Sequence, residues 1–191
     1  DYVYPGTTVL KNKAGIQDQT ALDAFEADAT AVRMLELLEQ PLEGRFDFAH
    51  LCAIHRHLFQ DVYDWAGEIR TVDISRDTSR FANMALIERY LGGVLARLPA
   101  ENWLRSLQPE PFVARLAHYM GEINATHPFR EGNGRTQRVF CALLAEQAGY
   151  FIDFESVDQA QMYRVMIANF NGNDKPLEAL LMNITSIIGE N

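Results

Sequence analysis

The chain has 191 residues, a length typical of one domain. Its apolar share of 48% and charged share of 23% are those of an ordinary globular protein and exclude a disordered chain. The net charge is −9, which argues against binding of nucleic acid or an anionic membrane over a broad surface. We therefore expect a single domain over residues 1–191, with neither nucleic acid nor membrane among its partners.

Neither the N-terminus nor the cysteines indicate an oxidising compartment. Residues 1–6 have no charged or apolar segment of the kind found in signal peptides, and no apolar run approaches the about 20 residues of a transmembrane helix. The missing initial Met is compatible with a piece of a longer protein. Cys52 and Cys141 stand in apolar helical patterns, and we expect buried thiols rather than a disulfide or a metal site.

The N-terminal third reads as an arm followed by two helices. Residues 1–16 predict an extended, turn-rich arm, and apolar residues recur at helical spacing from Thr20 to Leu38. The outer face of this helix is acidic: Asp23, Glu26, Asp28, Glu36 and Glu39. We expect a solvated face there, the alternative being a docking surface for a basic partner. Asp47 predicts the N-cap of a second helix that ends near Gln60.

Residues 66–83 change character and predict a β-hairpin. Ile69, Val72 and Ile74 favour strands, and residues 76–79 form a polar turn before the apolar pattern resumes at Phe81. Helices are then expected over about 84–98, 109–125, 134–148, 155–170 and 176–188. The fold class predicted is an all-α domain with one β-hairpin.

The most informative stretch is 127–138, with the sequence HPFREGNGRTQR. Pro128 ends one helix at His127, and a new helix begins near Gly134. Gly132 and Gly134 flank Asn133 and allow positive φ angles, so that successive backbone N–H groups can converge on one point. Such a turn at a helix N-terminus predicts an anion site.

Charged side chains strengthen this interpretation. Arg135 and Arg138 share one helical face in the first turn, where cations oppose the helix macrodipole unless a polyanion binds them. Guanidinium groups hold phosphate oxygens bidentately. Glu131 beside such a site favours a Mg²⁺ ion shared with the phosphates. His127 is then placed to act as a general base for an attacking hydroxyl.

The remaining histidines lack comparable neighbours in the sequence: His50, His55, His57 and His118. His55 and His57 are two positions apart on a helix and cannot face one another, which excludes a metal pair. The stretch 127–138 also lacks the Gly-Lys-Ser/Thr ending of a P-loop.

Residues 127–138 match the motif H-x-F-x-[D/E]-G-N-G-R-x-x-R at every defined position, and the chain is identified as a member of the Fic family. Residues 4–13 resemble the N-terminal arm of bacterial Fic toxins and secreted Fic effectors. Residues 61–70 and 71–82 are similar to the segment before the Fic flap hairpin and to the flap itself. The resemblance implies an all-helical Fic fold with a β-hairpin flap, and transfer of AMP from ATP to a Ser, Thr or Tyr hydroxyl.

The same resemblance implies roles for the motif residues. His127 would deprotonate the target hydroxyl, Phe129 would pack inward, and Glu131 would bind Mg²⁺. The anion hole for the α- and β-phosphates would be formed by Gly132, Asn133 and Gly134.

Further roles concern the nucleotide and the target protein. Arg135 would hold the β-phosphate and Arg138 the γ-phosphate of ATP. The flap, near Arg76 and Asp77, would cover the nucleotide and bind the target backbone as an added strand.

Many Fic enzymes carry an inhibitory helix with the pattern [S/T]-x-x-x-E-[G/N]. This chain has one match, from Ser186 to Asn191. The alternative, which we prefer, is that residues 186–188 continue the last core helix and Gly189 caps it. A small separate antitoxin would then supply the inhibitory Glu.

Three functions are compatible with the resemblance. The first is the toxin of a bacterial Fic toxin–antitoxin pair, a cytoplasmic protein that adenylylates type II topoisomerase. The second is the Fic domain of a secreted effector that modifies GTPases in the host cytosol. The third is a non-catalytic Fic-fold binding module, which degenerate motif positions would favour and which the complete motif here argues against.

Overall fold

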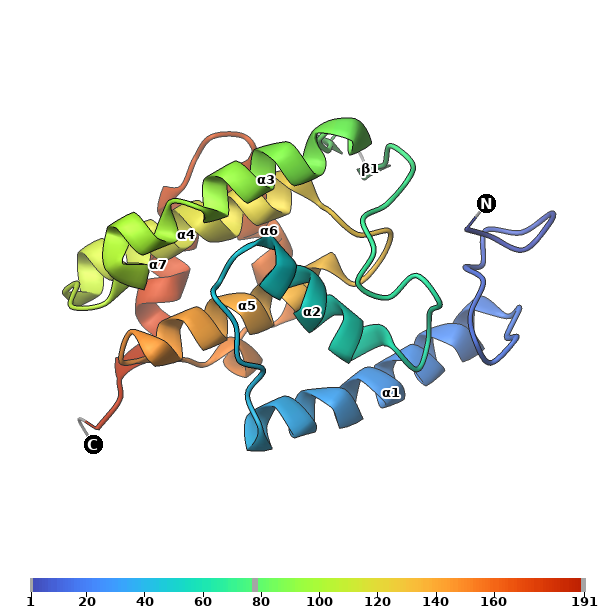
Figure 1. Cartoon of the computed structure of the whole chain (residues 1–191), viewed down its shortest axis with the longest axis horizontal. Coiled ribbons are helices and arrows are strands. Elements are labelled where there is room, and N and C mark those ends of the chain that lie inside the picture. Colours follow the sequence, from blue (N-terminus) through green and yellow to red (C-terminus); the bar gives the residue numbers. More distant parts are fainter. Residues whose placement is uncertain (1, 77–78, 190–191) are drawn as a thin grey trace.

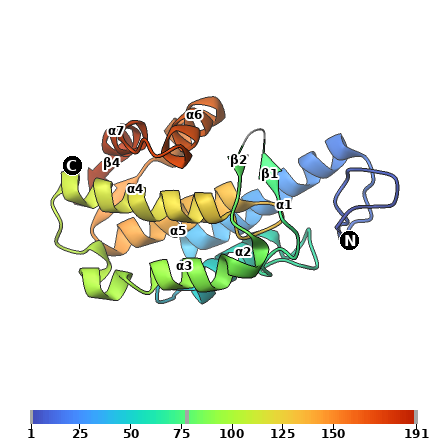
Figure 2. The same cartoon turned by 90° about the horizontal axis from the view of Figure 1, so that it is seen from above.

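The computed structural model describes residues 2–76 and 79–189 and is mostly helical, as predicted (Figures 1 and 2). The α-helices are α1 (Gln19–Glu39), α2 (Phe48–Phe59), α3 (Ile87–Leu95), α4 (Pro109–Thr126), α5 (Asn133–Gln147), α6 (Gln159–Phe170) and α7 (Lys175–Ile184). Short strands pair as β1 (Ser75–Arg76) with β2 (Ser79–Arg80) and as β3 (Tyr150–Ile152) with β4 (Thr185–Ile187).

Aspartate side chains define where several helices begin. Asp18 caps α1 by accepting a hydrogen bond from the amide of Ala21, and Asp158 caps α6 by accepting one from the amide of Gln161. Asp47 accepts from the amide of His50 at 2.9 Å, which confirms the predicted N-cap of α2. Pro109 occupies the first turn of α4, where its missing N–H costs no hydrogen bond.

The helices α4 and α5 form the centre of the molecule. They pack on each other, α5 also packs on α2, and α2 on α1, while α3, α6 and α7 pack against α4. In Figure 2, α6 and α7 lie on one side of the central pair and α3 on the other. Fully buried aromatic rings fill the space between these elements, among them Phe59, Phe112, Tyr119, Phe129 and Phe140. The loop between α4 and α5 is thereby fixed at one end of the central pair.

The C-terminal segment differs from the prediction. The last helix, α7, ends at Ile184, and residues 185–187 form β4, which pairs antiparallel with β3 in the register Tyr150↔Ile187. The expectation that residues 186–188 continue a helix is therefore wrong. Thr185, Ile187 and Ile188 are β-branched and favour strands. Gly189 follows this strand and does not cap α7.

Other boundaries also shift. The single helix expected over 84–98 is a 3₁₀ turn (Met84–Leu86), then α3, then an irregular 3₁₀ segment (Leu98–Leu104) that contains Pro99. The predicted hairpin is present, but its strands have only two residues each, in the register Ser75↔Arg80 and Arg76↔Ser79.

The N-terminal arm is extended, as predicted, and a bridge between Val3 and Leu10 closes it into a loop. Both cysteines are free, Cys141 buried and Cys52 half-buried. In the described part of the chain, every helix is too short or too polar to cross a bilayer.

Candidate active site at the α4–α5 loop

The loop between α4 and α5 is rigidly built. His127 ends α4 in the left-handed conformation, with φ 47° and ψ 65°, which costs a non-glycine residue about 1–2 kcal/mol. The Asn133 side chain closes the turn reciprocally: its Oδ1 accepts from the amide of Phe129 at 2.9 Å, and its Nδ2 donates to the Phe129 carbonyl at 2.8 Å. Phe129 is fully buried, as predicted. Asn133 therefore shapes the loop through its side chain.

The ring of His127 is held between the helix end and the flap. Its Nδ1 lies 3.3 Å from the carbonyl of Asn124, and because a carbonyl only accepts, Nδ1 carries the proton in the neutral ring. Nε2 is then the nitrogen that can accept a proton. Phe81, at the end of the flap, stacks on the ring at a centroid distance of 3.9 Å. This geometry suits the role of general base predicted for His127.

The N-terminus of α5 offers backbone N–H groups that have no partner within the helix. Gly132 is its N-cap, with φ 78°, and a Cβ there would lie 2.2 Å from the Phe59 ring. Both facts require glycine at this position. Gly134 is helical, so the predicted positive φ applies to Gly132 and not to Gly134. The first N–H groups of a helix have no intrahelical partner, which fits the predicted anion hole.

The two arginines differ in their surroundings. Arg135 reaches α1, where its guanidinium forms an ion pair with Glu26, bonds the Thr30 hydroxyl at 3.2 Å and covers the Phe59 ring at 4.7 Å. Its counter-charge is thus a carboxylate of the protein, and the argument that Arg135 needs a bound polyanion does not hold. Glu26 also accepts from the hydroxyl of Tyr63, so it is not the solvated residue that the acidic face predicts.

Arg138 has no such partner. It is the sixth residue of α5 and lies in the second turn, not the first. Helical side chains lean towards the N-terminus, and its Nη1 would contact a Cβ on Gly134 at 3.4 Å. Within residues 2–76 and 79–189, no carboxylate or hydrogen-bond acceptor pairs with this guanidinium. Burial and the nearby charge of Arg135 lower its pKa. An uncompensated cation therefore stands over the first turn of α5.

His55 is a site residue that the sequence did not reveal. The amide of Gly67 donates to its Nδ1 at 2.8 Å, so Nε2 carries the proton and donates to the Glu131 carbonyl at 3.0 Å. The ring stacks on Phe129 at 3.9 Å. Burial lowers its pKa to about 4, so it is neutral near pH 7. Helical periodicity places His55 on the buried face of α2, but only the fold brings the loop to it.

The remaining predicted site residues are the Mg²⁺ ligand Glu131 and the flap residues Arg76 and Asp77. Glu131 is exposed, and one carboxylate oxygen accepts from the amide of Gly132 at 2.8 Å. In the described part of the chain, no group of three or more His, Cys, Asp or Glu residues could hold a metal. A Mg²⁺ ion here would therefore rely on Glu131, phosphate oxygens and water, which is its usual arrangement in nucleotide sites. The backbone of Arg76 lies in β1, and Asp77 lies outside the described residues.

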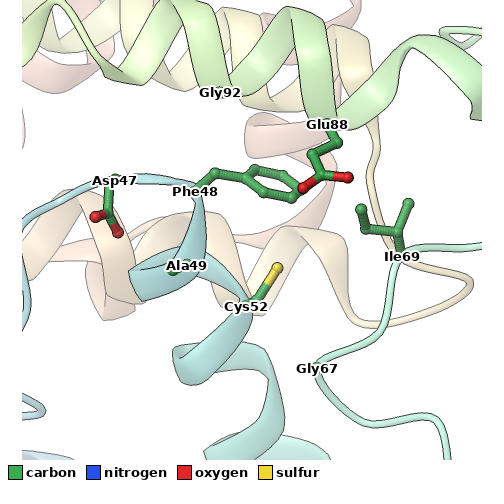
Figure 3. A pocket seen from close by; sticks show the side chains of 8 residues that line it. All are labelled: Asp47, Phe48, Ala49, Cys52, Gly67, Ile69, Glu88 and Gly92. Carbon is green, nitrogen blue, oxygen red and sulfur yellow. The ribbon is translucent and has the colours of Figure 1, made fainter.

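A broad pocket of about 590 Å³ lies elsewhere, between α2, α3 and residues 67–69 (Figure 3). Glu88 from α3 and the thiol of Cys52 from α2 face it, together with Phe48 and Ile69. Burial raises the pKa of Cys52 to about 11, which keeps it a protonated thiol. None of the predicted site residues lines this pocket, so the α4–α5 loop remains the candidate active site.

Comparisons with known proteins agree with this architecture. The model of the Fic/DOC family matches residues 45–145. The chain is 43% identical to the Probable protein adenylyltransferase y4lH of Sinorhizobium fredii over 92% of its own length and 91% of that protein. It is 44% identical to the Protein adenylyltransferase VbhT of Bartonella schoenbuchensis, over 94% of its own length but only 38% of VbhT.

A solved structure has the same fold. The N-terminal Fic domain of a VirB-translocated Bep effector protein from Bartonella quintana, crystallised with bound ADP, gives a TM-score of 0.91 at 33% identity. The match covers 98% of this chain and 95% of that one. The chain therefore belongs to the Fic/DOC family.

Proposed function

We propose that this protein is an adenylyltransferase that moves AMP from ATP to a Ser, Thr or Tyr hydroxyl of a target protein. The observation that carries the proposal is Arg138, a half-buried guanidinium without an acidic partner in the described residues, placed over the N-terminus of α5. A polyphosphate supplies the missing charge. The names of the curated relatives and the ADP bound to the related Bep domain support a nucleotide as the ligand.

The chemistry follows from what surrounds the loop. Nε2 of His127 accepts the proton of the target hydroxyl, which attacks the α-phosphorus in line with the leaving pyrophosphate. The backbone N–H groups of Asn133 and Gly134 bind the α- and β-phosphates, and that of Gly132 joins them when it exchanges the Glu131 carboxylate for a phosphate oxygen. Arg138 holds the γ-phosphate. Mg²⁺ at Glu131 would neutralise charge on the triphosphate. Arg135 is placed to bind the β-phosphate if it exchanges Glu26 for the nucleotide.

The flap is the proposed docking element for the target. Its strands β1 and β2 form a two-stranded ribbon with edges to which an extended target segment can add. Arg76, in β1, and Asp77, which lies outside the described residues, are proposed to cover the nucleotide. Phe81 connects this ribbon directly to the ring of His127.

Two biological settings are compatible with the proposed activity. A small antitoxin that supplies an inhibitory Glu, with type II topoisomerase as target in the bacterial cytoplasm, is the first candidate. A secreted effector that modifies host GTPases is the second, and the similarity to a VirB-translocated effector favours it specifically. Ser186 lies in β4 rather than on a helix, which weakens the intrinsic inhibitory motif; Glu190 lies outside the described residues.

The test is transfer of label from ATP in bacterial and host-cell lysates. We expect ATP labelled at the α-phosphate, with Mg²⁺, to label a protein band that ATP labelled at the γ-phosphate does not. His127→Ala should lower labelling by at least 100-fold, because it removes the base, while the Kd for ATP stays within threefold. His118→Ala on α4 is the control with unchanged labelling. Near-normal labelling by His127→Ala would contradict the assignment.

A further inference from the structure

Arg70 is among the most deeply buried charged side chains of the described residues, with its side chain fully inaccessible to solvent. Such burial of a cation is costly unless each donor finds a partner. The nearest carboxylate within the described chain is Asp73, whose Oδ1 is 3.7 Å from Nη1. The guanidinium is satisfied mainly by backbone carbonyls, and the identity of those carbonyls is informative.

The carbonyls come from the two ends of the flap and from the end of α4. Nη1 donates to Val72 at 2.6 Å, where the chain enters the flap, and Nη2 donates to Ala82, where the chain leaves it. Nε donates to His127 at 2.8 Å, and Nη2 also donates to Thr126 at 3.3 Å. One planar group thus joins three segments of the chain.

The end of α4 depends on these bonds. The last carbonyls of a helix have no intrahelical partner, and here those of Thr126 and His127 are taken by the Arg70 side chain. The next carbonyl, of Pro128, accepts from the Arg70 amide at 2.9 Å, and that of Ala125 accepts from the Ala82 amide at 3.2 Å. The flap segment therefore caps the helix that carries His127.

We propose that Arg70 is a positioning residue, which couples the flap to His127 so that a target strand bound at the flap meets the base in a fixed orientation. The proposal rests on the proposed function. Arg70 does not touch the reacting atoms; it acts through the backbone of His127 and through both ends of the flap. A lysine cannot replace it, because a single ammonium group lacks the planar fork that reaches carbonyls in several directions.

Hydrogen exchange measured by NMR on the whole chain tests the coupling without reference to activity. In Arg70→Lys and Arg70→Gln we expect the Ala82 amide to exchange at least tenfold faster, with unchanged protection of core amides in α2. Arg97→Lys, an exposed arginine outside the site, is the matched control. In the unmodified protein, the Arg70 Nε–H and the Ala82 amide should open at the same rate. If the exchange rates of these two groups in the unmodified protein differ by more than tenfold, the proposal is overturned. This measurement does not depend on whether the variants fold.

Kinetics then test the consequence. We expect Arg70→Lys to lower kcat for AMP transfer at least 30-fold and to raise KM for the target protein, with the Kd for ATP within threefold. If Arg70→Lys lost ATP binding and overall stability as strongly as it lost kcat, Arg70 would have only a general structural role, and the proposal would be overturned. A fully active Arg70→Lys would also overturn it. If the unmodified protein transfers no AMP at all, the proposed function fails, and the exchange rates still decide whether Arg70 couples the flap to His127.

Discussion

Single residues in this protein are fixed by contacts from distant segments. His127 keeps a left-handed backbone because the carbonyls at the end of α4 are bound by Arg70 and Ala82. His55 fixes the opposite side of the same loop through the Glu131 carbonyl. In both cases a side chain from another segment holds the backbone of the loop in one conformation.

The buried ring of His55 makes the stability of the protein depend on pH. Its folded pKa of about 4 lies below the ordinary 6.5, so the unfolded chain binds a proton first as the pH falls. The neutral His55 ring contributes about 3 kcal/mol to the free energy of unfolding above pH 6.5. This contribution is lost as the pH falls from 6.5 to 4. Titration of its ring signals by NMR checks this, with His55→Gln to assign them. A midpoint near 6.5 would contradict it.

Among the elements, α1 is more than a covering helix. Three of its acidic residues, Asp23, Asp28 and Glu39, are exposed as predicted. Glu26 instead binds Arg135 and Tyr63, and Glu36 binds Arg33. The same acidic pattern thus contains solvated residues and an ion pair to the motif helix, so α1 helps to orient α5.

This role predicts the effect of Glu26→Gln. The change leaves the half-buried Arg135 without its counter-charge, and we expect the free energy of unfolding to fall by about 2 kcal/mol. Asp23→Asn, on the exposed side of α1, should change it by less than about 0.5 kcal/mol. Urea denaturation measures both. A double-mutant cycle with Arg135→Gln should give a coupling of about 1–3 kcal/mol; additive effects would show that the pair contributes nothing.

At the scale of the whole molecule, the acidic residues and the motif cation Arg138 differ in their exposure to solvent. Most acidic residues lie on the surface, whereas Arg138 is half-buried in the second turn of α5. Repulsion between the acidic surface and a triphosphate bound at Arg138 is weakened, because salt screens exposed charges over about 10 Å. The molecule can therefore be acidic overall and still bind a triphosphate at one place.

Ligand-induced stabilisation of the whole domain checks this. ATP with Mg²⁺ at 100 times its Kd should stabilise the folded state by about 2.7 kcal/mol, which raises Tm by about 5–10 °C for a chain of this size. Arg138→Met should abolish the increase without lowering the Tm of the free protein, because among residues 2–76 and 79–189 its guanidinium has no acidic partner to lose. Arg97→Met should keep the full increase. An unchanged ATP response in Arg138→Met would disprove the assignment.

The sequence by itself determined the helical fold, the flap region and the left-handed turn at Gly132, because helical periodicity and a twelve-residue motif are local signals. The resemblance to the Fic family added the burial of Phe129. Only the tertiary structure decided which partners these residues meet. It joined Arg135 to Glu26, Glu131 to His55, and Arg70 to both flap ends, and it made a strand of residues 185–187 by pairing them with β3. Such contacts join residues up to 109 positions apart, and no local pattern of residues encodes them. The two motif arginines therefore differ: Arg135 is neutralised within the fold, whereas Arg138, which has no acidic partner among the described residues, is the one proposed to bind the triphosphate.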